Sequence, residues 1–166
     1  MNKYILAGLL VMGLVVAGCN AKDIIKSLVE KAYKVTVNTE NLVTKSSTEE
    51  FVLTVKLMDT PLKLLKATLG YVETKITDQK VKDAIAKGIK AIDKITTVVA
   101  NITPEKVNEV KVTVLSSLED VKIALKFIGE YVGAIFPTAS VASNADPKKE
   151  LNTSCDDLSK LLKEAK

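Results

Sequence analysis

The sequence contains no histidine, no arginine and no tryptophan among its 166 residues. Without histidine it has no imidazole, the side chain that exchanges protons near neutral pH. It also cannot form the common zinc and di-iron sites that use histidine as a ligand. Without arginine it has no guanidinium group to hold a phosphate or carboxylate through two parallel hydrogen bonds. These absences exclude many known catalytic and metal centres.

Other motifs that carry chemistry are missing as well. The sequence has no glycine-rich phosphate-binding motif, no Ser-x-x-Lys pair and no glycine-rich oxyanion loop. Its acidic pairs, Glu49 with Glu50 and Asp156 with Asp157, lack the loop of converging oxygen ligands that a calcium ion requires. We therefore predict that the protein is not an enzyme and that it holds no metal and no cofactor.

The basic residues do not form a nucleic-acid-binding surface in the sequence. All 24 are lysine, they alternate with acidic residues, and the formal net charge is only +4. Aromatic residues make up 4% of the chain. Because nucleic-acid binding calls for a basic stripe with arginine or stacking aromatic side chains, we predict no nucleic-acid partner.

The first twenty residues follow a plan of their own. Lys3 supplies a positive charge, and an apolar run without charged residues covers residues 4–17. The run closes on small residues and a thiol: Val16, Ala17, Gly18 and Cys19. This is the layout of a secretory signal peptide. The run is also shorter than the roughly 20 apolar residues that cross a bilayer as a helix.

This ending resembles the lipobox of bacterial lipoproteins, whose pattern is Leu or Val, two small residues and Cys. The resemblance covers residues 1–20. It implies cleavage before Cys19, diacylglycerol on the Cys19 sulfur and usually a further acyl chain, such as palmitate, on the new N-terminus. Two or three acyl chains hold a protein firmly at a membrane.

The same resemblance implies a place in the bacterial cell envelope. An aspartate after the lipidated cysteine favours retention at the inner membrane, and this chain has Asn20 there, which favours the outer membrane. The alternative interpretation is an uncleaved membrane span, with Cys19 as an ordinary thiol.

After residue 20, apolar residues recur in steps of three and four, which is the mark of a stripe along one helix face. The steps predict helices ending near residues 45, 76, 102, 135 and 166. The most regular stripe is Val81, Ile85, Gly88, Ile92, Ile95, Val99 and Ile102. Its strict period of 3.5 indicates packing of the coiled-coil type. Gly88 should let a neighbouring helix approach closely.

The helix boundaries carry local signals. Ser47 with Glu50 forms a capping box before an apolar run. Thr103 is expected at the N-cap of the helix that ends near residue 135, and Pro104 at its first position.

Two segments leave alternatives open. Pro61 should end or kink a helix, but the apolar phase runs through it, so we predict one kinked helix in preference to two separate ones. After Tyr33, a cluster of β-branched residues would also suit an extended segment.

These patterns predict an all-α fold: an antiparallel up-and-down bundle of four long helices plus a shorter C-terminal fifth. The expected organisation is a signal peptide over residues 1–18, a bundle over 19–136, a linker over 137–147, and a C-terminal helix over 148–166 that packs on the bundle. With Cys19 acylated, Cys155 is left alone, which suggests an intermolecular disulfide or a buried thiol. Its apolar position in the last stripe favours the buried thiol.

Two features near the end of the fourth long helix bear on contacts. Gly129 and Gly133 have the small-xxx-small spacing of membrane helix contacts, but nearby charges favour core packing. Ile135 and Phe136, with the linker, are the predicted contact surface.

The sequence supports two functional hypotheses. The first is a non-enzymatic, lipid-anchored helical bundle that acts through contacts with an unknown protein partner in a structural, assembly or host-interaction role. The alternative is a carrier of a lipid or other apolar ligand, which predicts a pocket lined by Leu, Val and Ile.

Overall fold

The computed structural model describes residues 19–136 and 146–166, and these residues form helices with no strand among them. The all-α prediction is therefore confirmed. The elements are α2 (Cys19–Lys45), α3 (Thr48–Leu57), α4 (Asp59–Lys75), α5 (Gln79–Ala100), the 3₁₀ turn η1 (Pro104–Lys106), α6 (Val107–Val132) and α7 (Pro147–Ala165). The predicted signal peptide and residues 137–145 of the predicted linker lie outside the described residues.

Helix α2 stays helical through its β-branched segment, so the extended alternative is wrong. The buried hydroxyls of Thr36 and Thr39 donate to the carbonyls of Ala32 and Val35, at 2.8 Å in each case. These bonds satisfy both hydroxyls within the helix itself. The threonines can therefore sit in the core without a partner from another element.

Both predicted helix starts lie at the expected residues, with Ser47 at the N-cap of α3 and Thr103 at the N-cap of η1, but only Ser47 caps through its side chain. The capping box at α3 is confirmed: the Glu50 N–H donates to Ser47 Oγ at 3.2 Å, and the Ser47 N–H donates to Glu50 Oε2 at 3.1 Å. The Thr103 side chain, in contrast, makes no capping hydrogen bond. Its backbone carbonyl instead accepts from the Lys106 N–H at 2.9 Å, which closes the 3₁₀ turn before α6 begins.

The prediction of one continuous helix through Pro61 is wrong, because Met58 separates α3 from α4. Proline has no N–H, and its ring clashes with the carbonyl four residues earlier. For Pro61 that carbonyl belongs to Leu57, the last residue of α3. Met58 keeps right-handed helical angles (φ −82°, ψ −16°), so the interruption is only one residue long.

Helix α6 is one long helix of 26 residues, as predicted, but it ends before the last residues of the apolar stripe. Gly133 adopts a left-handed conformation (φ +75°) and terminates the helix. The Ala134 N–H then donates to the Gly129 carbonyl at 2.8 Å. Ile135 lies beyond this turn and is 74% exposed, so its predicted place on the helix stripe is wrong.

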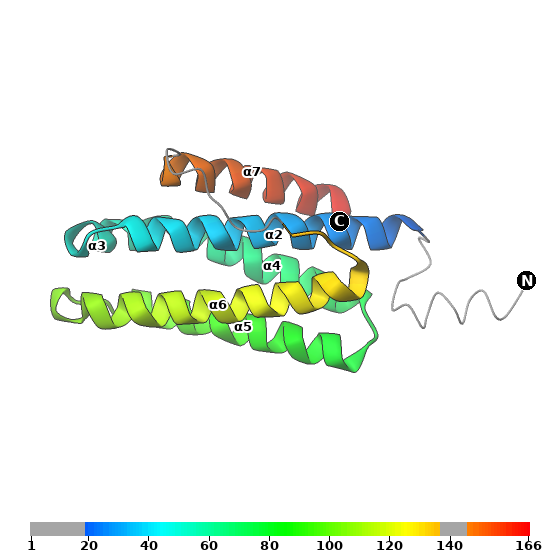
Figure 1. The fold of residues 1–166 in the computed structure, drawn as a ribbon, viewed down its shortest axis with the longest axis horizontal. Helices are drawn as coiled ribbons and strands as arrows, with labels where there is room; N and C mark the ends of the chain where they lie inside the picture. The colour runs from blue at the N-terminus through cyan, green and yellow to red at the C-terminus, as the bar shows by residue number, and fades with distance from the viewer. Residues whose placement is uncertain (1–18, 137–145) are drawn as a thin grey trace, which may run out of the picture.

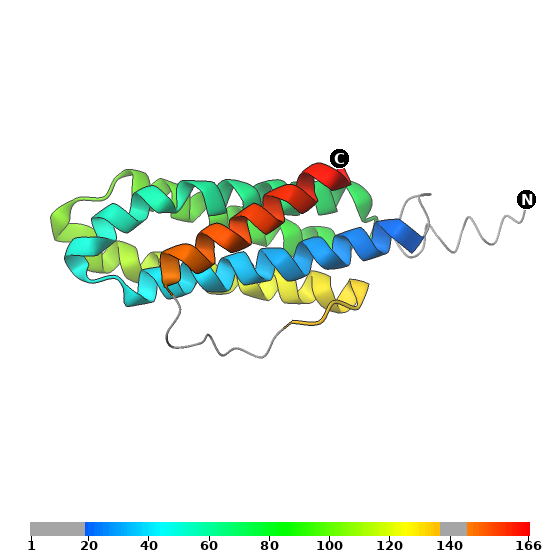
Figure 2. The same cartoon turned by 90° about the horizontal axis from the view of Figure 1, so that it is seen from above.

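Helices α2, α4, α5 and α6 run roughly along the long axis of the molecule around an aliphatic core (Figure 1), and α7 crosses α2 obliquely (Figure 2). Helix α2 contacts α4, α6 and α7, while α5 contacts α4 and α6. The close approach predicted at Gly88 is confirmed. A Cβ atom there would come within 3.0 Å of Leu69 Cδ1 and 3.1 Å of Ala124 Cβ.

The C-terminal helix α7 packs on α2 and α4. Its buried residues are Leu151, Ser154, Cys155, Leu158 and Leu162. Two side chains make hydrogen bonds across this interface. Asn38 Nδ2 of α2 donates to Ser154 Oγ at 3.1 Å and to the Glu150 carbonyl at 3.2 Å, and the Tyr71 hydroxyl of α4 donates to the Ala165 carbonyl at 3.2 Å.

Candidate interaction surfaces

The residues predicted to carry the lipid lie at the start of the chain. Val16, Ala17 and Gly18 lie outside the described residues, and Cys19 is the first residue of α2. Cleavage and acylation at Cys19 stay predictions.

Helix α2 lies between Cys19 and helix α3, which carries an exposed apolar surface. The helix has 27 residues, which corresponds to about 40 Å at the rise of an α-helix. Helix α3 follows after Ser46 and Ser47, so it lies at the opposite end of α2 from Cys19 (Figure 1).

Helix α3 exposes large apolar side chains there. Val52 is 39% exposed, Leu53 64% and Leu57 42%, while Phe51 of the same helix is fully buried. We call these three exposed side chains the α3 apolar face. The apolar periodicity did not predict this face, although the run of adjacent apolar residues in the sequence indicates it. Consecutive helical residues lie about 100° apart, so Phe51, Val52 and Leu53 cannot all enter one core.

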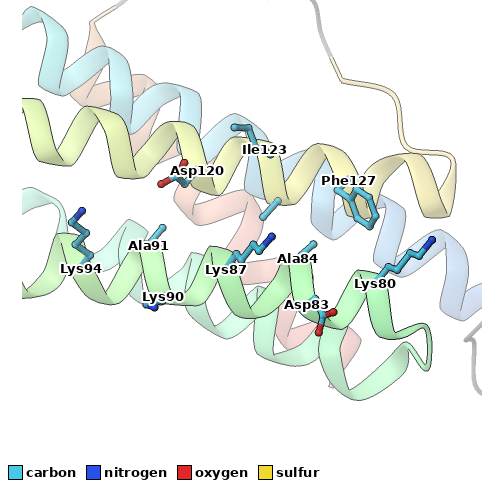
Figure 3. A pocket seen from close by; sticks show the side chains of 11 residues that line it. Lys80, Asp83, Ala84, Lys87, Lys90, Ala91, Lys94, Asp120, Ile123 and Phe127 are labelled. Atoms are coloured by element: carbon cyan, nitrogen blue, oxygen red, sulfur yellow. The ribbon is translucent and has the colours of Figure 1, made fainter.

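A second surface lies between α5 and α6, where the molecule has an open groove of about 670 Å³ (Figure 3). Ala84 and Ala91 of α5 and Ala124 of α6 line it with small side chains. On the α6 side it includes two large exposed apolar residues, Ile123 (57%) and Phe127 (42%). We call this the α5–α6 groove.

The α5 side of the groove carries a positive charge. Its lysines are Lys80, Lys87, Lys90 and Lys94. Two aspartates, Asp83 and Asp120, also line it, which leaves two positive charges in excess. Within residues 19–136 and 146–166, none of the four lysines has an ion pair or a hydrogen bond from its ammonium group.

The sequence patterns did not predict the groove. The available signal was the spacing. Lys80, Lys87 and Lys94 repeat every seven residues and therefore form one row along α5, beside the small residues Ala84 and Ala91.

At the predicted contact surface, Ile135 and Phe136 have different surroundings, and Phe136 packs within the fold. Its ring packs against Tyr33, with ring centroids 4.6 Å apart, and fills the space beside Gly129. Gly129 therefore serves core packing, as predicted, whereas Gly133 ends the helix. Ile135 is exposed, and its N–H donates to Glu30 Oε2 at 2.8 Å.

A charged cluster joins α2 to α6. Lys122 Nζ lies 3.2 Å from Glu40 Oε1 and 3.0 Å from Glu119 Oε2. Burial lowers the pKa of Lys122, but the hydrogen bonds to Glu119 and Glu40 outweigh it, so the pKa is raised overall. The lysine is held in its charged form and belongs to the helix interface, not to a reactive site.

The prediction that Cys155 is a buried thiol is confirmed, since it is 5% exposed. Burial, with a smaller effect from the charge of Asp156, raises its pKa to about 11. Because the thiolate is the nucleophilic form, this thiol is a poor nucleophile near neutral pH.

Two further findings concern only the described part of the chain. It holds no group of three or more cysteine, aspartate or glutamate side chains placed to bind a metal ion. None of its helices is long and apolar enough to cross a membrane. Comparison with protein-family models, with curated proteins and with solved structures finds no match for this chain.

Proposed function

We propose that the protein is a bacterial lipoprotein, anchored through acyl chains on Cys19, that acts without catalysis by contacting another protein at the cell envelope. Its role is structural, in assembly or in host interaction. Asn20, in place of an aspartate, supports the outer membrane as its location.

We also propose that the helices form an antiparallel up-and-down bundle. The four long members are α2, α3 with α4, α5 and α6, and α7 is the shorter fifth. The contacts of α2 with α4 and α6, and of α5 with the same two helices, support this arrangement. The regular stripe of α5 supports coiled-coil-type packing.

The observation that carries the proposal is the position of the α3 apolar face relative to Cys19. Cys19 begins α2 and α3 follows the other end of α2, which is about 40 Å long. An anchor at Cys19 would hold α3 away from the lipid, where exposed apolar side chains can meet a protein but not the bilayer. Contiguous exposed apolar side chains are typical of protein contact sites.

The carrier hypothesis comes second. It predicts a pocket lined by Leu, Val and Ile, whereas the α5–α6 groove is lined mainly by alanine and lysine and is open to solvent. An acyl chain in an open groove would keep much of its surface in water.

A localisation experiment tests the anchor. The full chain and the variant Cys19→Ala are expressed in a bacterium that has two membranes, and the membranes are separated. We expect the parent chain in the outer-membrane fraction and the variant outside that fraction. A variant that fractionates like the parent would contradict an anchor on Cys19.

A crosslinking experiment tests the contact. A photoreactive residue at Leu53 should give a discrete adduct in cells, and the same residue at exposed Lys160 of α7, which belongs to neither predicted contact surface, is the matched control. Loss of the Leu53 adduct in the variant Val52→Glu would assign it to the α3 apolar face. No adduct at Leu53, or equal adducts at both positions, would contradict the proposed contact.

A further inference from the structure

We propose that the α5–α6 groove binds an acidic amphipathic helix of a partner protein. This inference rests on the proposed function, because it assumes that the protein acts through protein contacts, and it adds the chemistry of the partner. It concerns a surface separate from the α3 apolar face.

The shape of the groove suits a helix. The small side chains Ala84, Ala91 and Ala124 leave room for a third helix to lie along α5 and α6. The groove is open along one side (Figure 3). An amphipathic helix fits such a groove because it places its apolar face inside and leaves its polar face in water.

The charge of the groove specifies the polar part of that helix. Lys80, Lys87 and Lys94 form a row in which neighbours lie seven residues, or about 10 Å, apart along α5. A partner helix aligned with α5 meets this row with acidic residues at the same interval. The four groove lysines have no acidic partner within the described residues, so they are available for such pairs.

The opposite side of the groove specifies the apolar part. Ile123 and Phe127 of α6 expose 57% and 42% of their surface. They would cover the apolar stripe of the incoming helix, and an aromatic side chain is a common anchor of protein contacts.

Charge also argues against this chain as its own partner. Two copies meeting groove to groove would bring their lysine rows together, and like charges at an interface are unfavourable. Helix α7 already packs on α2 and α4, so it is not the missing helix.

The test uses the full chain in nanodiscs of phosphatidylcholine, which has no net charge. The probe is a fluorescent synthetic peptide with a helical leucine stripe flanked by glutamates. A scrambled peptide of equal composition controls for charge alone, and a peptide with lysine replacing glutamate controls for sign. We expect binding of the first peptide only, weakening as salt is raised.

Three variants locate the site. Lys87→Glu with Lys94→Glu should weaken binding about tenfold, because two attractive pairs become repulsive. Phe127→Ala should weaken it roughly fivefold through lost apolar contact. Lys148→Glu with Lys149→Glu, on exposed residues of α7, has the same change in net charge and should bind like the parent chain.

Several results would overturn the inference. The first is that the scrambled peptide binds as well as the helical peptide. The second is that the α7 control variant loses as much binding as the groove variant. The third is that phosphatidylglycerol vesicles bind through Lys87 and Lys94 whereas the peptide does not. Concentration-dependent self-association lost in the lysine variant would also overturn it, in favour of a second copy. Failure here leaves the Cys19 fractionation and the Leu53 adduct unchanged, so the two proposals can fail separately.

Discussion

The ring of Phe136 fills the space that a side chain on Gly129 would occupy. Gly133 allows this contact, because its left-handed backbone (φ +75°) turns the chain back along α6. Tyr33 of α2 packs against the same ring, with the ring centroids 4.6 Å apart. The end of α6 is thus joined to α2 by packing that depends on a missing side chain.

This relationship predicts that Gly129→Ala destabilises the fold. The new methyl group overlaps the Phe136 ring and must displace it, which should outweigh the gain in helix propensity and cost about 1–2 kcal/mol. Chemical denaturation of parent and variant measures the change.

The matched control is Gly70→Ala in α4. A Cβ atom at Gly70 meets nothing within 4 Å, so alanine there should stabilise the protein by roughly 0.5–1 kcal/mol. If both substitutions stabilise the protein equally, the contact between Phe136 and Gly129 is not part of the folded state.

A second prediction concerns the close approach of α5 and α6. Gly88→Ala should lower the free energy of unfolding by about 1 kcal/mol. The new Cβ would lie 3.1 Å from Ala124 Cβ, which cannot move without the backbone of α6 because it is bonded directly to it. In the double variant with Ala124→Gly the contact is relieved. The unfolding free energies should therefore be non-additive, with the double variant more stable than the sum of the single changes predicts. Additive changes would place the two residues out of contact.

A third prediction concerns the attachment of α7. Asn38→Ala removes the hydrogen bonds from α2 to Ser154 and to the Glu150 carbonyl, and should cost about 1–2 kcal/mol. Amide hydrogen exchange should accelerate in α7 more than in α5. Thr153→Ala, on the exposed face of α7, should change stability by less than about 0.5 kcal/mol and serves as the reference. Uniform acceleration in all helices would argue against a local role for Asn38.

These contacts mark how far the sequence could predict the structure. The pair Ser47 and Glu50 acts at a single helix start and was predicted correctly. The stripe of α5 is buried from Val81 to Ile95 as predicted, but its last predicted member, Ile102, lies beyond the end of the helix at Ala100. Pro61 was recognised as a disruption, but the break falls at Met58, because the clash occurs with the carbonyl of Leu57, before the proline itself.

Features formed between distant residues were beyond this reasoning. The packing of Phe136 on Gly129 requires the turn at Gly133 and the position of Tyr33, neither of which follows from periodicity. The α5–α6 groove likewise depends on which faces of two helices meet. A row of lysines in a sequence has the same pattern whether it borders a groove or a convex surface.

A fourth prediction concerns pH. The Cys155 pKa is raised from its ordinary value near 9 to about 11, so the folded state keeps its proton where the unfolded state loses it. Stability from this group is therefore full below pH 9 and falls as the pH rises from 9 to 11, by up to roughly 2 kcal/mol. The variant Cys155→Ala should lack this part of the pH dependence.

Thiol labelling checks the same prediction independently. In a Cys19→Ala background, Cys155 is the only thiol of the chain. At pH 8 it should react at least about a hundredfold more slowly than the unfolded chain, because its thiolate is correspondingly scarcer. Equal rates in folded and unfolded protein would contradict a buried thiol in α7.

The most direct test of the account is the intact mass of the chain extracted from bacterial membranes in mild detergent. We predict a mass that shows cleavage before Cys19 and the addition of two or three acyl chains. A full-length, unacylated mass would contradict the anchor, and with it the proposal that α2 holds a contact surface at a distance from the membrane.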